Sequence, residues 1–315
     1  MEILGGTAGW SYDDWVGPFY PQDQPKGFSR LKFYSKFFDC VEVDSTFYRH
    51  FHPKVAEKWL GEAEDNPNFV FLTKLYKSFT HGNHESGDEL DADRKIVMEF
   101  LRPLLEQRKL GGVLVQFSEY FKDGISSRNY LPSIVDQFDR IQLFFELRHK
   151  SWYTPQAMEF LKERGISIIA IDQPRLKGMV GLTPDVVGET GYFRLHGRNE
   201  KMWEISRKAL AERRSSSGSA RNDDVGRNDR YNYLYSSGEL DEIEGQIRRV
   251  AERCKRIYLV ANNHPMGKAV ANALELVKRL RDQERISVPD TVIKYFPELE
   301  KIAEKVDVSP NDTLF

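Results

Sequence analysis

Short apolar runs and longer amphipathic segments alternate along almost the whole chain. Eight of the runs are rich in Val, Ile, Leu and Phe and end in polar residues, a pattern typical of strands buried in a parallel sheet. They lie at residues 3–10, 40–47, 69–76, 111–118, 141–149, 167–173, 192–198 and 256–264. Between most of them, apolar residues spaced three and four apart predict helices. This order indicates repeated strand–helix–strand units with parallel strands.

Eight such units in about 280 residues match a TIM-type (β/α)8 barrel. We therefore predict this α/β fold for residues 1–285, with an open doubly wound sheet as the alternative. Two irregularities are expected. The sixth and seventh strands are joined by a segment without a helical pattern, so that crossover should be degenerate. Residues 199–238 form a long link after the seventh strand, and its Ser-, Gly-, Arg- and Asp-rich middle is expected to be mobile. Residues 286–315 are expected to form a tail packed on the barrel.

The seventh run, residues 190–198, has an unusual alternation of side chains. Arg194, His196 and Arg198 are separated by single apolar residues or glycine. On a strand this period of two puts all three polar side chains on one face. Charges on a buried face need partners, unless they line a pocket. The pattern predicts either a polar network or a site at this position.

Polar residues also end the other expected strands, and in a barrel of this type function resides at the carboxyl ends of the strands. The candidates for acid–base chemistry are Glu42, Asp44, Glu146 and His196. The candidates for substrate binding are Trp10, Lys74, Gln116, Arg148, Asp172, Arg194, Arg198, Tyr231, Asn262 and Asn263. The structural alternative is that these charges only form salt bridges within the barrel.

Composition limits the classes of function. The net charge of −2 and the pI near 6.4 argue against nucleic-acid binding through overall charge. Cys40 and Cys254 are expected to be buried, reduced thiols. No apolar run reaches the roughly 20 residues of a membrane span, and the first residues lack a signal-peptide pattern, so a cytoplasmic location is expected. No phosphate-binding or nucleophile-elbow motif occurs, and the cofactor question stays open.

Several sequence blocks together resemble the domain of unknown function 72 (DUF72, YecE-like) family. These blocks are GTAGWSYDDWVGPFYP, VEVDSTFYR, FELRHKSW, RLHGR and ANNH followed by GKAVANALEL. They occur in order over about residues 1–280, and the resemblance implies a TIM-type barrel. It implies no reaction, because the family's activity is not established. Three features depart from the family pattern. Two are sequence elements, at residues 116–119 and 261–264, and the third is a Ser- and Arg-rich insertion before Arg230 that is longer than expected. Arg230 and Tyr231 resemble its Arg-Tyr element, which would return the long link to the pocket.

The leading hypothesis is an enzyme that acts on a small anionic molecule, phosphorylated or nucleotide-like. Lys74, Arg148 and Arg198 would hold the anion, and one of the candidate carboxylates would perform acid–base work with His196. One alternative is a non-catalytic protein that binds nucleic acid or nucleotides through residues 207–230. Another is a divalent-metal-dependent isomerase or nuclease. Its oxygen-rich site would use Glu42, Asp44, Glu146, Asp172 and His196.

Overall fold

Eight parallel strands form one curved sheet in the order β5-β4-β3-β2-β1-β8-β7-β6. The computed structural model describes residues 1–82, 87–182, 186–215 and 229–307. The strands are β1 (Glu2–Ala8), β2 (Cys40–Val43), β3 (Val70–Lys74), β4 (Leu110–Gln116), β5 (Leu143–Glu146), β6 (Ala170–Asp172), β7 (Thr190–Leu195) and β8 (Arg256–Ala261). The edge strands β5 and β6 meet at a short parallel bridge between Phe145 and Ile168. Two backbone hydrogen bonds, of 2.7 and 3.0 Å, join Phe145 to Ser167 and Ile169 there. The predicted TIM-type barrel is therefore confirmed.

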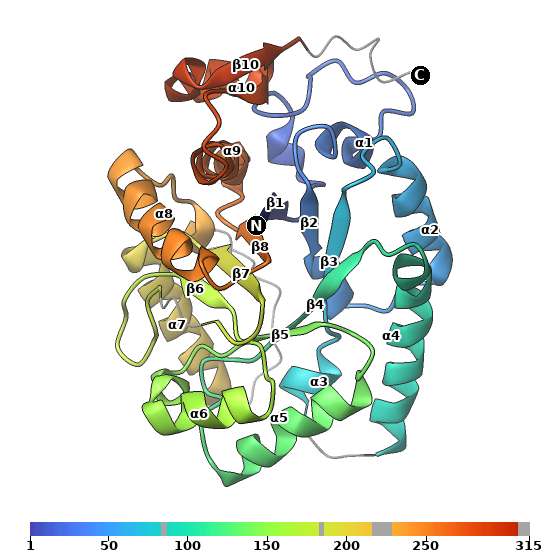
Figure 1. Cartoon of the computed structure of the whole chain (residues 1–315), viewed down its shortest axis with the longest axis vertical. Coiled ribbons are helices and arrows are strands. Elements are labelled where there is room, and N and C mark those ends of the chain that lie inside the picture. The colour runs from blue at the N-terminus through green and yellow to red at the C-terminus, as the bar shows by residue number, and fades with distance from the viewer. Residues whose placement is uncertain (83–86, 183–185, 216–228, 308–315) are drawn as a thin grey trace.

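Helices alternate with the strands and surround them (Figure 1). They are α1 (Arg30–Tyr34), α2 (Pro53–Glu62), α3 (Ser78–His81), α4 (Asp88–Glu106), α5 (Ile125–Gln137), α6 (Pro155–Glu163), α7 (Glu200–Ser215), α8 (Ser237–Ala251) and α9 (Lys268–Leu280). Local chemistry starts several of them. The Ser29 hydroxyl caps α1, Thr154 caps α6 before a first-turn proline, and Ser236 and Glu239 form a capping box on α8. The described part of the connection between β6 and β7 contains no helix, as the degenerate crossover predicts.

Short 3₁₀ helices follow several strands and shape the loops at their carboxyl ends. They are η1 (Asp13–Trp15), η2 (Asp44–Phe47), η3 (Lys150–Tyr153), η4 (Asp229–Tyr231) and η5 (Pro265–Gly267). A further one, η6 (Pro297–Lys301), lies in the C-terminal segment. Two elements within the loops were not predicted, namely α3 after β3 and α7 after β7. The predicted mobility of the link's middle falls mostly on residues 216–228, which lie outside the described residues.

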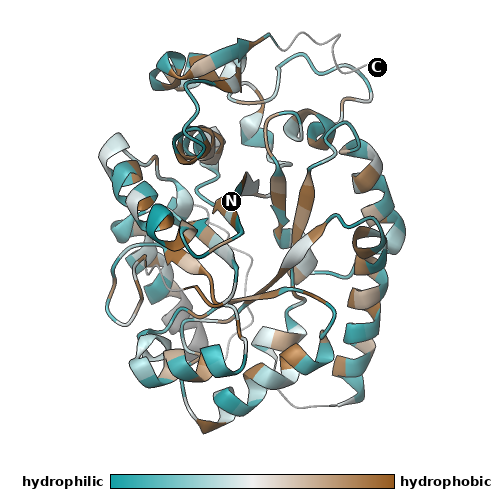
Figure 2. Ribbon diagram, viewed as in Figure 1, coloured by the Kyte–Doolittle hydropathy of each residue, from teal (hydrophilic) through white to brown (hydrophobic). Residues whose placement is uncertain are grey.

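The core has two layers, because side chains of the strands alternate between the barrel interior and the helices. The interior layer includes Leu72, Leu114, Phe144 and Tyr258. The larger layer lies between the outer face of the strands and the apolar stripes of the helices. Figure 2 shows this as brown strands within a ring of helices whose outward faces are mostly teal. Both cysteines are buried and free, as expected.

The segment after α9 forms a small two-stranded parallel sheet of β9 (Ile286–Pro289) and β10 (Ala303–Val306), joined by α10 (Asp290–Tyr295) and η6. The Thr291 hydroxyl donates to the carbonyl oxygen of Phe19 at 2.8 Å. The side chain of Phe296 is buried beside Gly267. This segment thus contacts the loop after β1 and the start of α9, at the top of Figure 1. Residues 308–315 lie outside the described residues.

Candidate functional site

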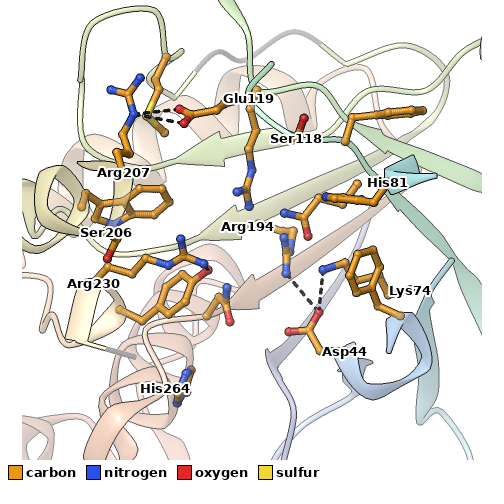
Figure 3. Close-up of a pocket in the computed structure, with 18 of the residues that line it drawn as sticks. Asp44, Lys74, His81, Ser118, Glu119, Arg194, Ser206, Arg207, Arg230 and His264 are labelled. Carbon is orange, nitrogen blue, oxygen red and sulfur yellow. Dashed lines mark hydrogen bonds and ion pairs between the residues drawn. The ribbon is translucent and has the colours of Figure 1, made fainter. Parts of the chain in front are cut away.

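A cavity of about 720 Å³ opens at the carboxyl ends of the strands (Figure 3). The loops and strand ends that form its walls come from distant parts of the chain, and α7 and η4 supply one side of it. Its lining includes seven residues that the sequence singled out: Asp44, Lys74, Gln116, Arg148, Arg194, Tyr231 and Asn262. Five cations of Lys and Arg line the cavity, against two carboxylates of Asp and Glu. The walls therefore carry more positive than negative side chains.

A buried ionic network lies beneath this cavity, inside the barrel. The Arg194 guanidinium donates to Glu42 Oε1 at 2.5 Å and, through its other terminal nitrogen, to Glu146 Oε2. Arg148 donates to Glu146 Oε1 at 2.5 Å, and the Tyr192 hydroxyl donates to Glu42. Glu42, Glu146 and Arg194 are at most 1% exposed. Buried charges are tolerated here because each has an opposite charge in contact with it.

The two buried carboxyl groups have opposite pKa shifts. Burial raises the pKa of Glu42 to about 7, because the lowering influence of Arg194 does not offset the loss of solvation. Burial also acts to raise the pKa of Glu146, but Arg148 and Arg194 outweigh it and hold that pKa well below its usual range. Glu42 can thus carry a proton near neutral pH, whereas Glu146 is a permanent anion.

His196 is fully buried beside this network rather than on the cavity wall. Burial and the neighbouring Arg194 lower its pKa, so the ring is neutral. The Asn262 amide nitrogen donates to Nδ1 at 2.8 Å, which leaves the ring proton on Nε2. Nε2 lies 3.8 Å from Glu146 Oε1. In this arrangement His196 offers a donor and has no free basic nitrogen.

The cations of the wall differ in their partners. Lys74 lies 3.6 Å from Asp44, and Arg207 of α7 lies 3.0 Å from Glu119. Arg230 of η4 instead lies over two aromatic rings, 5.1 Å from the centre of Trp203 and 4.6 Å from that of Tyr231. It donates to the Tyr231 hydroxyl at 2.7 Å. Among the described side chains, no carboxylate lies within ion-pair distance of Arg230.

Two predicted site residues, Asp172 and Arg198, belong to a separate network. Arg198 binds Asp172 through two nitrogens, at 3.0 and 2.7 Å, and Glu242 of α8 at 2.8 Å. The Tyr235 hydroxyl donates to Asp172 at 2.6 Å. Neither residue lines the cavity. The expectation that Arg198 shares a face with Arg194 is wrong, because Gly197 has a φ of 84° and turns the chain before that residue.

Trp10 and Asn263 also lie away from the cavity lining. Trp10 packs edge-on against Trp59, with ring centres 5.5 Å apart. The Asn263 amide donates to the Tyr233 carbonyl at 2.8 Å and to Asn272 at 2.9 Å. Asp172 was expected at the mouth with the other candidates, and this prediction is wrong. Its side chain contacts Tyr235 and Arg198 and has the strand parity of Ala170, which packs in the outer layer.

Several residues that build the site are not among the predicted catalytic and substrate-binding residues. Tyr192 has the same strand parity as Arg194, and that parity could have placed it on the interior face. Trp203 and Arg207 lie on α7, within a polar stretch where no helix was predicted. His264 lines the cavity and stacks on Tyr12, with ring centres 4.4 Å apart and nearly parallel planes. The Tyr12–His264 contact joins the loops after β1 and β8, which the sequence alone does not relate.

Buried polar atoms without a hydrogen-bond partner gather at this end of the barrel. Nine side-chain atoms in the described residues have this property, and all belong to residues at or beyond the carboxyl end of a strand. They belong to Asp44, Ser78, Gln173, Arg194, His196, Trp203, Arg230, Asn263 and His264. Such atoms are rare in folded proteins because each costs free energy. Five of the nine belong to residues that line the cavity, namely Asp44, Arg194, Trp203, Arg230 and His264. Such a concentration around one cavity is typical of a binding site.

Two other hypotheses can be compared with this geometry. Among the described residues, no three His, Cys, Asp or Glu side chains are grouped so as to hold a metal ion. The Arg194 guanidinium bridges Glu42 and Glu146. Asp172 pairs with Arg198, away from the cavity lining. Residues 216–228 of the proposed nucleic-acid-binding segment 207–230 lie outside the described residues. In the described part of the chain, no helix is long and apolar enough to cross a membrane.

The fold and the cavity together define an α/β barrel with a polar, cation-lined pocket at the carboxyl ends of its strands. The model of the family described as "Protein of unknown function DUF72" matches residues 4–293, and the chain belongs to this family. The UPF0759 protein YunF of Bacillus subtilis (strain 168) is 28% identical over 293 residues, which cover 88% of this chain and 94% of YunF.

Solved structures agree with this assignment. A DUF72 family protein (TM1631) of Thermotoga maritima MSB8 superposes with a TM-score of 0.72 at 29% identity, covering 89% of this chain and 100% of that protein. A DUF72 family protein (EF0366) of Enterococcus faecalis V583 gives a TM-score of 0.71 at 26% identity, covering 89% of this chain and 95% of that protein. The resemblance to this family seen in the sequence blocks is therefore confirmed.

Proposed function

We propose that this protein is an enzyme that acts on a small anionic substrate, phosphorylated or nucleotide-like, in the cavity at the carboxyl ends of the strands. The observation that carries the proposal is Arg230, a cavity-lining cation without a carboxylate partner among the described side chains. A guanidinium held by aromatic rings and a hydroxyl is preorganised to form two parallel hydrogen bonds with a phosphate or carboxylate. Arg148 and Lys74 add positive charge on other walls.

The cavity also offers groups for proton transfer. Asp44 lines it, and Glu42 lies directly behind Arg194 with a pKa raised to about 7 by burial. A carboxyl group with a pKa near the working pH can both give and take a proton. Tyr12, Trp203 and Tyr231 provide ring faces on which a planar base could stack. These features favour catalysis on an anion over passive binding.

A metabolite-depletion assay tests the proposal without knowledge of the reaction. Wild-type protein and Arg230→Gln are incubated with a mixture of phosphorylated and carboxylated metabolites, and mass spectrometry follows each compound. We expect the wild type to deplete at least one anion and Arg230→Gln to lose at least about 90% of that rate, since one charge-assisted contact contributes roughly 1.5–3 kcal/mol. Arg256→Gln, at the opposite end of the barrel, is the matched control and should behave as wild type.

Depletion of neutral compounds alone would contradict the proposal, as would equal rates for wild type and Arg230→Gln. The competing hypothesis of nucleic-acid binding through residues 207–230 predicts a different behaviour. It requires RNA affinity that falls steeply with salt, which a fluorescence titration at several salt concentrations measures. A salt slope near zero removes that hypothesis.

A further inference from the structure

The cavity walls contain both hydrogen-bond donors and hydrogen-bond acceptors that have no partner among the described residues. On one wall, Arg230 and Trp203 have N–H groups that donate to no described residue. On another wall, the carboxylate of Asp44 accepts no hydrogen bond from a described residue. A ligand that completes only one kind leaves the other unpaired, and an unpaired buried polar group costs free energy. The two kinds together therefore describe the chemistry of the ligand.

The Asp44 carboxylate is held in place without being saturated. It begins η2 at the end of β2, and its side chain is 31% exposed. Its Oδ1 lies 3.6 Å from Lys74 Nζ and 3.8 Å from an Arg194 nitrogen, which are ion-pair distances longer than hydrogen bonds. The two cations offset its charge, so Asp44 need not repel an anionic ligand. Because an ionised carboxylate only accepts hydrogen bonds, an O–H or N–H group is its complement.

The Arg230 guanidinium needs the opposite partner. One terminal nitrogen donates to the Tyr231 hydroxyl, and Nε has no partner. Trp203, which is 2% exposed, adds an indole N–H without an acceptor. Acceptor-rich anions such as phosphate or carboxylate complement these donors. Figure 3 shows Arg230 and Asp44 on different sides of the view, with Arg194 between them.

We infer that the substrate is a small anion that also carries a hydroxyl or amine group. Its phosphate or carboxylate binds at Arg230, and its hydroxyl or amine donates to Asp44, which becomes the residue that selects among anions. This inference rests on the proposed function, since it assumes that the cavity binds an anion. A site built to accept a hydrogen bond rejects an analogue that lacks the donor, because its own buried group then stays unpaired.

Titration calorimetry with matched ligand pairs tests the inference on the full chain. Glycerol 3-phosphate is compared with n-propyl phosphate, and glycerate with propionate. Within each pair the anionic group is the same and only the hydroxyls differ. We expect the hydroxylated member to bind about ten-fold tighter or more to the wild type. Asp44→Asn and Asp44→Ala should reduce this preference below about three-fold, while Arg230→Gln should weaken both members alike. Thermal melts establish that each variant is folded.

The outcomes separate the two ideas. If simple anions bind and Arg230→Gln weakens them, but the hydroxylated member gains nothing in the wild type, the inference is overturned and the proposed function stands. A preference that survives in both Asp44 variants overturns the inference as well. If no anion of either pair binds, the proposed function fails and the inference fails with it. A preference lost in both folded Asp44 variants supports the inference.

Discussion

The arginines at the two ends of the barrel differ in whether they pair with carboxylates. At the amino end, Arg256 binds Glu2 at 2.6 Å, and Arg281 binds Asp39 at 2.5 Å and the Ile3 carbonyl at 2.6 Å. At the carboxyl end, Arg230 has no carboxylate partner among the described side chains. All the partnerless buried side-chain atoms of the described residues lie at this end too. The unpartnered polar groups at the carboxyl end lower the stability of the folded protein. This is the end at which barrels of this kind carry function.

Arg194 should show the largest effect on stability. Arg194→Met leaves Glu42 and Glu146 buried with one opposite charge fewer, and breaking a buried ion pair costs about 3–5 kcal/mol. Urea unfolding at neutral pH measures the loss in the free energy of unfolding. Arg256→Met is the control, because its exposed pair with Glu2 should contribute less than about 1 kcal/mol. Equal losses of unfolding free energy in the two variants would contradict the proposed difference between the two ends of the barrel.

The pH dependence of stability should show the raised pKa of Glu42. The unfolded chain loses this proton near pH 4.5, but the folded protein holds it up to about pH 7. The folded state binds more protons in this interval, so the contribution of Glu42 to the free energy of unfolding is fully present below pH 4.5 and falls as the pH rises through 7. We expect a decline on the order of 2 kcal/mol between pH 5 and pH 8.

The comparison that isolates this effect uses two variants. Glu42→Gln removes the titrating group, so the stability of wild type relative to Glu42→Gln should decline over this interval. Glu146→Gln is the control. The pKa of Glu146 is lowered, and its stabilising contribution is lost only as pH falls through that lowered value, below this range. Urea unfolding curves at pH 5 and pH 8 give the free energy of unfolding of each protein. If wild type and Glu42→Gln differ in this free energy by the same amount at both pH values, the raised pKa of Glu42 is contradicted.

Arg198 should have a smaller effect and none on the cavity. Arg198→Gln removes the charge that pairs with the buried Asp172, although Tyr235 still donates to that carboxylate. We expect a loss of about 1–3 kcal/mol in the free energy of unfolding. Anion affinity in calorimetry should stay within about two-fold of wild type, since Arg198 does not line the cavity. A ten-fold loss of anion affinity without loss of stability would show that Arg198 contributes to the anion-binding site.

The sequence predicted the barrel because its signal is repeated. Eight buried strands with helical segments between most of them leave few other arrangements, and polar residues at the strand ends point to the carboxyl mouth. Alternation also predicted that the polar residues of the seventh strand share one face, either in a polar network or at a site. Arg194 of that strand indeed pairs with the buried Glu42. Such alternation holds within the strand and fails for Arg198, which follows the turn at Gly197.

Other parts of the site could not be predicted from local patterns. Residues 167–173 are buried throughout, so their pattern does not say that Asp172 faces outward. The left-handed backbone at Gly197 decides the direction of Arg198, and glycine permits that conformation without requiring it. Trp203 and Arg230 reach the cavity through α7 and η4, in a polar link where tertiary contacts override weak helical signals.

A selenate soak of crystals of the protein tests the central claim most directly, since selenate mimics phosphate and sulfate and its selenium scatters anomalously. We predict an anomalous peak inside the cavity, with a selenate oxygen within hydrogen-bond distance of the Arg230 guanidinium, and its disappearance in Arg230→Gln. An ordered selenate at other surfaces together with an empty cavity in the wild type would contradict the claim.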